Sequence, residues 1–130
     1  RGGGKNGEKG DVFSTARLAG LAALKQTSTL IPLCHPVRVV GSDVTMSVEP
    51  HLPGVRIVVE VHARDRTGVE MEAMVGAAAA ALTIYDMVKG VERGVTVGPI
   101  RLLEKSGGRS GHWIAEAVSA RRLAKPGRSR

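Results

Sequence analysis

The clearest pair of groups for proton transfer is Asp86 and Lys89, within the segment LTIYDMVK at residues 82–89. The two residues are three positions apart, so in a helix their side chains share one face and can reach each other. Most pairs at this spacing are ordinary surface ion pairs. The flanking residues are apolar here, and a half-buried lysine beside an aspartate can have its pKa moved into the range useful for acid–base catalysis. The spacing alone is therefore compatible with both roles.

A second candidate is a turn at residues 27–36, TSTLIPLCHP, which places His35 beside Cys34. Its two prolines break a helix and fix an extended or turning backbone around these residues. A histidine held on so stiff a turn suits contact with a phosphate or a base, and a purely structural histidine fits the same pattern. There is no second cysteine, and no other histidine has ligand spacing, so we predict no metal site.

Two further charged segments are candidates for substrate contacts. Residues 67–73 bring Glu70 and Glu72 to the start of a predicted helix. Carboxylates there offset the helix dipole, or they hydrogen-bond the amino groups of a purine-like ring. Residues 105–111 form a cationic glycine loop whose backbone N–H groups can face an anion. The loop lacks the spacing of a Walker A motif, so ATPase chemistry is not predicted.

The hydrophobic pattern predicts the elements that must position these groups. Asp11 can cap the first helix, alternation marks two strands joined by a turn at 51–54, and Gly90 ends an alanine-rich helix. The predicted order is a flexible Gly-rich loop at 1–10, a helix at 11–25, strands at 42–49 and 55–61, a helix at 72–89 and a strand at 95–103.

This order predicts an α+β fold. With one more strand in front it becomes the βαββαβ pattern of a ferredoxin-like sandwich, an antiparallel sheet with helices on one face. The first strand of that pattern is missing from this sequence. We expect a single catalytic domain over 11–113 and a basic C-terminal tail over 114–130.

Size and composition fit one small domain that relies on subunit contacts. The 130 residues are 42% hydrophobic but only 2% aromatic, so small aliphatic side chains must fill the core. Such side chains bury little area each, which favours an oligomer. The single cysteine fits a reducing compartment, no secretory signal opens the sequence, and no apolar run is long enough to span a bilayer. We therefore expect a cytoplasmic protein without membrane partners.

The net charge of +7 raises the possibility of nucleic-acid binding. Residues 114–130 hold five basic residues and one acidic residue, which is typical of a solvated tail. Modules that bind single strands also need stacking aromatics, and the three aromatic residues are too scattered for that. We expect no nucleic-acid partner. A binding module that holds RNA or acidic partners through its tail is the alternative function.

Five segments, in order, resemble the molybdenum-cofactor biosynthesis protein C family, the cyclic pyranopterin monophosphate synthases. They are KGDVFSTARLAG, TSTLIPLCHPV, TGVEMEA, ALTIYDMVK and GPIRLLEKSGGRSG, running from Lys9 to Gly111. The resemblance implies a lyase without a cofactor that converts 3',8-cyclo-7,8-dihydro-GTP into cyclic pyranopterin monophosphate and releases pyrophosphate. It also implies a homohexamer, a trimer of dimers, with pockets at the dimer interface.

The resemblance also implies roles for individual residues. Asp86 and Lys89 match the family's acid–base pair in the motif YDM-x-K. The residues matching substrate-binding positions are Leu33, Cys34, His35, Met71, Glu72, Lys9, Glu70 and Lys105. Cations suit a triphosphate, and a guanine-derived ring needs hydrogen-bond partners. Family members carry a strand and a basic pocket residue before the KGD motif, which this sequence does not include, and the tail beyond Trp113 exceeds the family core.

Helix geometry predicts that each active site is built from two subunits. If Glu72 and Asp86 lie on one continuous helix, fourteen residues separate them, or roughly 21 Å, on nearly the same face. One small substrate cannot touch both residues of a single copy. Antiparallel packing of two such helices across a two-fold axis would bring Glu72 of one subunit beside Asp86 of the other.

Overall fold

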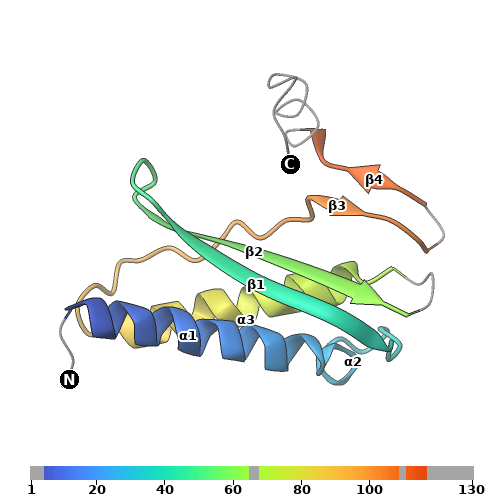
Figure 1. Ribbon diagram of the computed structural model, residues 1–130, viewed down its shortest axis with the longest axis horizontal. Coiled ribbons are helices and arrows are strands. Elements are labelled where there is room, and N and C mark those ends of the chain that lie inside the picture. Colours follow the sequence, from blue (N-terminus) through green and yellow to red (C-terminus); the bar gives the residue numbers. More distant parts are fainter. Residues whose placement is uncertain (1–4, 65–67, 109–110, 117–130) are drawn as a thin grey trace.

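The computed structural model describes residues 5–64, 68–108 and 111–116, with side chains from Asp11 onward. Figure 1 shows how these elements are arranged. In chain order they are α1 (Lys5–Leu24), α2 (Thr27–Leu30), β1 (Val39–Glu49), β2 (Gly54–Ala63), α3 (Glu70–Val88), β3 (Glu104–Lys105) and β4 (Trp113–Ile114).

The predicted hairpin and the long second helix are confirmed. β1 pairs with β2 in antiparallel register, with Val44 opposite Val59 and Glu49 opposite Gly54. The alternation of β-branched residues explains the strands, because in β2 partly buried positions alternate with exposed ones. α3 runs without a break from Glu70 to Val88.

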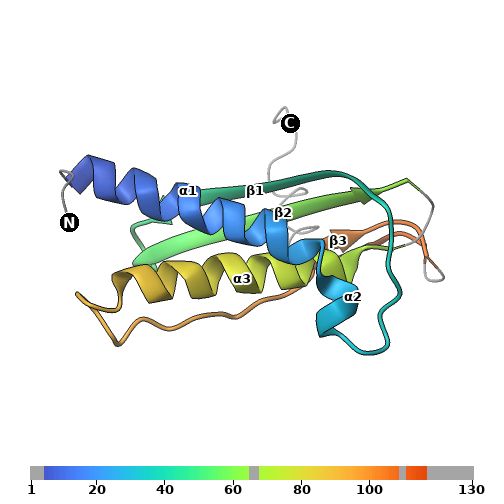
Figure 2. The ribbon, with the colours of Figure 1, turned by 90° about the horizontal axis from the view of Figure 1, so that it is seen from below.

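The two long helices lie side by side on one face of the hairpin (Figures 1 and 2). α1 packs against α3 and β1, and α3 packs against α1 and β2. The α+β class and the ferredoxin-like placement of both helices on one face of an antiparallel sheet are therefore confirmed. Within the described residues the strands form two separate two-stranded sheets, β1–β2 and β3–β4.

The core between these layers is built from small side chains. Ala16 of α1, Val44 of β1 and Ala80 of α3 form its buried centre. The partly buried side chains around them are Leu21, Met46, Ile57, Val59 and Ile84. The composition had indicated such a core.

Two glycines set how closely the helices approach. A Cβ on Gly20 of α1 would lie 3.0 Å from the carbonyl oxygen of Gly76. A Cβ on Gly76 of α3 would lie 3.3 Å from the carbonyl oxygen of Gly20 and 3.3 Å from Val59. Both residues lie in regular helix, so neither needs glycine for an unusual backbone angle. Glycine is needed here because a side chain would collide with the neighbouring helix.

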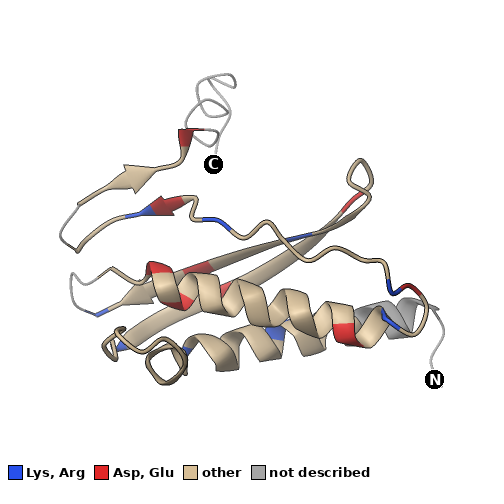
Figure 3. Ribbon diagram, turned by 180° about the vertical axis from the view of Figure 1, so that it is seen from behind, with Lys and Arg blue, Asp and Glu red and all other residues tan. Residues whose placement is uncertain are grey.

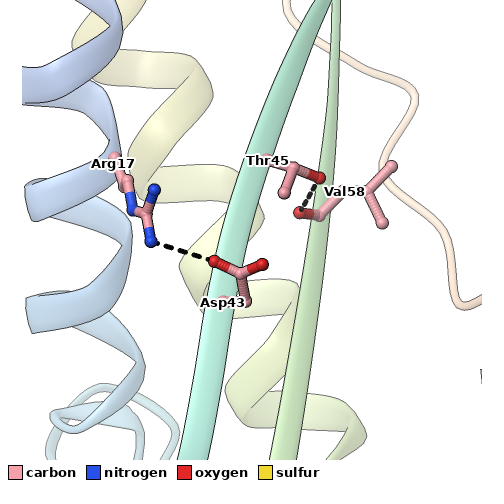
Figure 4. A network of polar contacts seen from close by, with 4 residues as sticks. All are labelled: Arg17, Asp43, Thr45 and Val58. Carbon is pink, nitrogen blue, oxygen red and sulfur yellow. Dashed lines mark hydrogen bonds and ion pairs between the residues drawn. The ribbon is translucent and has the colours of Figure 1, made fainter.

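A polar contact ties α1 to the hairpin at its edge. The Arg17 guanidinium lies 3.1 Å from Oδ1 of Asp43, and the hydroxyl of Thr45 donates to the carbonyl oxygen of Val58 across the strands (Figure 4). About half of each charged side chain remains exposed, so this ion pair stabilises the fold only slightly.

By length and composition alone, α3 could cross a membrane. The sequence had not indicated a membrane span, because its apolar runs are short. The contacts of α3 with α1 and β2 instead make it a layer of the domain. Only Glu72, Gly76 and Ala80 of the helix are buried in the single chain. Most other side chains of α3 are only partly buried, and Leu82 is 57% exposed.

The prediction of a loop at 1–10 is wrong for residues 5–10, whose backbone forms the start of α1. Gly7 and Gly10 weaken a helix by about 1 kcal/mol each relative to alanine, which lowers helix stability without forbidding the helix. A short helix, α2, also precedes the prolines of the 27–36 turn and ends at Leu30.

The predicted strand at 95–103 is also wrong: this segment belongs to neither sheet, and the strand that follows it is β3. Gly98 has a φ of 107°, and Pro99 has no N–H to donate, so the middle of the segment cannot continue a regular ladder. Val95, Val97 and Ile100 are each 37% exposed.

The boundary predicted after Trp113 falls inside β4, where Lys105 pairs with Trp113 and Glu104 with Ile114. Ala115 is 6% exposed, and its N–H donates to the carbonyl oxygen of Leu103. The fold therefore includes the first residues assigned to the tail. Residues 117–130 lie outside the described residues.

Candidate functional site

The pair Asp86 and Lys89 closes the C-terminal end of α3. The Lys89 ammonium lies 2.9 Å from Oδ1 of Asp86, and the backbone N–H of Lys89 donates to the carbonyl oxygen of Tyr85 in the last helical turn. The side chains are 47% exposed for Lys89 and 71% exposed for Asp86. The sequence spacing predicted this contact correctly.

The pKa of Lys89 shifts in the opposite direction to that expected for a lysine whose burial dominates. The hydrogen bond and the charge of Asp86 raise the pKa of Lys89 in the single chain. A lysine pKa falls when burial removes solvent from the ammonium, and here both side chains face solvent. In the single chain Lys89 is therefore a protonated donor, and Asp86 holds it in place.

A second group of predicted residues lies at the other end of α3. Glu72 is only 4% exposed, in the first turn of the helix, where the dipole favours a carboxylate. The Cys34 thiol lies 3.9 Å from Oε2 of Glu72, so the turn and the helix start meet.

A small cavity of about 200 Å³ borders Glu72. Its lining is Leu24, Lys25, Thr27, Ser28, Pro36, Val37, Val39 and Glu72. Lys25 and Ser28 were not predicted from the motifs. Their positions in the sequence could have indicated them, since both flank the junction between a predicted helix and the proline turn.

The surroundings of Cys34 raise the pKa of its thiol, first through burial and then through the negative charge and hydrogen bond of Glu72. The thiol is thus kept protonated at neutral pH. Because the native pKa lies above the unfolded one, the stabilisation is present below the unfolded pKa and is lost as pH rises through the native pKa.

Glu72→Gln is therefore expected to speed the alkylation of Cys34 by iodoacetamide at pH 8. Removing the negative charge lowers the pKa of the thiol, and the thiolate fraction changes tenfold per unit of pKa, so we expect roughly a two- to tenfold faster reaction. Glu92→Gln, on an exposed loop, is the matched control and should react like the unmodified chain. An unchanged rate in Glu72→Gln would contradict the role of this carboxylate.

Glu70, Gly68 and Lys105 converge beside the same end of α3. A Cβ on Gly68 would lie 2.8 Å from Oε1 of Glu70 and 3.4 Å from Cε of Lys105. Gly108, with a φ of 71°, brings its backbone within reach of the ammonium, since a Cβ there would lie 3.5 Å from Nζ of Lys105. The cationic loop and the acidic helix start therefore meet, as far as the loop is described.

The remaining predicted site residues lie on the turn, on α3 and at the start of α1. Leu33 is 93% exposed and His35 is exposed on the turn, whereas Met71 is partly buried on α3. Lys9 belongs to the backbone of α1, and its side chain lies outside the described part.

The predicted site residues thus fall into two groups at opposite ends of one helix. Glu72 with its neighbours lies at the start of α3, and Asp86 with Lys89 lies at its end, about 21 Å away along the axis. Charged positions mark both ends of the helix, and the turns between them carry none (Figure 3). The premise of a continuous helix is confirmed, and one copy of the chain does not bring the two groups together.

A further polar contact braces the end that carries Lys89. The Tyr85 hydroxyl donates to the carbonyl oxygen of Arg93 at 3.0 Å, which fastens the loop after α3 to the helix. Tyr85 precedes Asp86 directly, but no pattern in the sequence pointed to this bond. Among the described side chains, no group of three histidine, cysteine or acidic residues is placed to hold a metal ion.

Known proteins match this chain over most of its length. The family model described as MoaC family matches residues 3–108. A protein of Methylobacterium nodulans named cyclic pyranopterin monophosphate synthase is 54% identical over 109 residues, which are 84% of this chain and 68% of that protein. Proteins of the same name from Brucella melitensis biotype 2 and Trichodesmium erythraeum are each 50% identical, covering 89% and 85% of this chain and 71% and 67% of their own lengths.

A family model that covers residues 3–108 includes α1, the hairpin, α3 and the segment that leads to β3. It also includes both groups of candidate site residues. The chain therefore belongs to the MoaC family.

Proposed function

We propose that the chain is a subunit of a cyclic pyranopterin monophosphate synthase, a lyase that converts 3',8-cyclo-7,8-dihydro-GTP into cyclic pyranopterin monophosphate and pyrophosphate. The observation that carries this proposal is the 2.9 Å contact between Lys89 and Asp86 within the motif YDM-x-K. Relatives that are 50–54% identical over most of the chain carry the name of that enzyme, which supports the same reaction.

The reaction needs groups that move protons. A triphosphate that becomes a cyclic monophosphate exchanges the bond from its α-phosphorus to pyrophosphate for a bond to a hydroxyl of the same molecule. The hydroxyl loses a proton, and the pieces balance without added water. A carboxylate that accepts a proton and an ammonium that donates one suit such a step, and Asp86 and Lys89 supply them side by side.

The second group of residues suits binding of the substrate. Lys105 and Lys9 can neutralise phosphate charge, while Glu70 and Glu72 can accept hydrogen bonds from ring amino groups. The turn of Leu33, Cys34 and His35, together with Met71, would complete the pocket. The convergence of Glu70 and Lys105 beside Gly68, at the same end of α3 as Glu72, supports this division of roles.

We further propose that each pocket is shared between two subunits of a dimer, within a hexamer that works in the cytoplasm. Two observations support the shared pocket: the two groups lie about 21 Å apart along one continuous helix, and most apolar side chains of α3 are only partly buried in the single chain. A second copy of α3, packed antiparallel, would cover those side chains and bring Glu72 near Asp86 of the partner subunit. Burial there would also lower the pKa of Lys89.

The direct test is incubation of the purified chain with 3',8-cyclo-7,8-dihydro-GTP. We expect pyrophosphate to be released and a fluorescent pterin to form after oxidation of the product. A folded chain that binds the substrate but releases no more pyrophosphate than the Asp86→Asn, Lys89→Met double variant would contradict the proposal. Salt-sensitive RNA binding that disappears on deletion of residues 117–130 would favour the binding-module alternative instead.

A further inference from the structure

The last turn of α3 brings Tyr85 as well as Asp86 close to Lys89. Lys89 follows Tyr85 by four positions and Asp86 by three, so the three side chains share one side of the helix. Asp86 contacts the ammonium at 2.9 Å. The hydrogen bond and charge of Asp86 raise the pKa of Lys89, and Tyr85 shifts it in the same direction. The phenol is therefore also a neighbour of the ammonium.

Lys89 lies at the very end of the helix. It is the C-cap residue of α3, with a φ of -62° and a ψ of -21°, and its N–H donates to the carbonyl oxygen of Tyr85 at 2.9 Å. The chain turns back beyond it, and residues 89–100 are all exposed in the single chain (Figure 2). Exposed helix ends fray, so the contact of Lys89 with Asp86 exists only while this last turn is formed.

Three hydrogen bonds fold the exposed chain back onto this turn. The N–H groups of residues 91–92 donate to the carbonyl oxygen of Val88 at 2.9 and 3.0 Å. The Tyr85 hydroxyl donates to the carbonyl oxygen of Arg93 at 3.0 Å, eight positions along the chain. The two backbone bonds begin after Lys89, whereas the bond of the phenol closes a loop that contains Lys89.

We propose that Tyr85 is a positioning residue for Lys89. Its hydroxyl, bound to the carbonyl oxygen of Arg93, keeps the last turn of α3 formed and so holds the ammonium where it meets Asp86 and the substrate. The hydroxyl proton is directed at that carbonyl oxygen, so the phenol acts through Lys89 and is not a second acid. The inference rests on the proposed function, in which Lys89 donates a proton.

The expected effect is that of one hydrogen bond near the protein surface. A lysine side chain has high rotamer entropy, and an exposed ion pair at a spacing of three constrains it only weakly. Loss of the bond from Tyr85 should therefore be felt at Lys89. The rate should fall roughly two- to tenfold, far less than the ~10²–10⁴ expected when Lys89 itself is removed.

The test is Tyr85→Phe, which removes the hydroxyl and keeps the ring. We expect kcat for pyrophosphate release to fall roughly two- to tenfold, while the Kd of the substrate measured by calorimetry changes by less than about twofold. Thr83→Val is the matched control. It removes another hydroxyl of α3, one that donates to the carbonyl oxygen of Ala79 within the helix, and should retain full turnover.

Two further measurements need no substrate. Nitrogen relaxation at about pH 6 gives the order parameter of the Lys89 ammonium, which should fall in Tyr85→Phe because the last turn frays more often. The amides of residues 91–92 should exchange hydrogen roughly two- to tenfold faster. Thr83→Val should change neither quantity.

The outcomes separate positioning from a local structural role. An unchanged order parameter in Tyr85→Phe, or an unchanged kcat despite a lower order parameter, would overturn the proposal, because the bond would then only brace the loop. A fall in kcat with an equal loss of substrate affinity would overturn it too. If the unmodified chain releases no pyrophosphate, the proposed reaction is wrong, and the substrate-free measurements still decide whether Tyr85 holds Lys89 in place.

Discussion

Replacing Lys89 by methionine or Asp86 by asparagine is expected to abolish formation of cyclic pyranopterin monophosphate. Each change removes one member of the contacting pair at the end of α3, and loss of one acid–base group typically slows a reaction by ~10²–10⁴. Both side chains are exposed in the single chain, so the fold should persist. Turnover is measured by pyrophosphate release, and substrate binding by calorimetry.

The hairpin offers a matched control for these variants. Arg56 and Glu49 form an ion pair at 3.4 Å on β2 and β1 and belong to neither group of candidate site residues. Arg56→Met and Glu49→Gln should retain full turnover. If Lys89→Met and Asp86→Asn also stay within a few-fold of the unmodified chain, the pair has no catalytic role.

Co-expression of Asp86→Asn subunits with Glu72→Ala subunits, each inactive alone, is expected to restore activity. In a mixed dimer with shared sites, one pocket carries both changes and the other carries neither. Random pairing makes about half of the dimers mixed, so roughly a quarter of all pockets should be intact. Mixed dimers isolated with two different tags should show half the activity of the unmodified dimer.

A second combination gives the opposite expectation and serves as the control. Asp86 and Lys89 lie on the same end of the same helix, so every pocket of a mixed Asp86→Asn and Lys89→Met dimer carries a defect. That combination should stay inactive. Activity in neither mixture, with both dimers folded, would rule out a pocket shared in this way.

The elements with strong local patterns were predictable from the sequence. The hairpin followed from strict alternation around its turn, and α3 from the alanine-rich pattern that predicted a helix at 72–89. The start of α1 was missed because Gly7 and Gly10 lower helix propensity without forbidding a helix. The strand at 95–103 was overpredicted because alternation reports a pattern, whereas a strand also needs a partner for its backbone groups.

The candidate site was predictable at short range only. The spacing of three residues correctly gave the contact between Asp86 and Lys89, and helix geometry gave the separation of Glu72 from Asp86. The contact between Cys34 and Glu72, 38 residues apart in the chain, emerged only once the fold brought the turn against α3. The direction of the pKa shift of Lys89 could not be predicted, because the hydrogen bond and charge of Asp86 raise this pKa while burial lowers it, and the sequence does not give the extent of burial.

The crossing of α1 and α3 has a consequence for engineering this protein. Replacement of helical glycine by alanine is a common route to greater heat resistance, because alanine favours a helix by about 1 kcal/mol. At Gly20 and Gly76 the added methyl group would meet the backbone of the neighbouring helix. A thermostabilised version should therefore keep these two glycines and make its changes elsewhere.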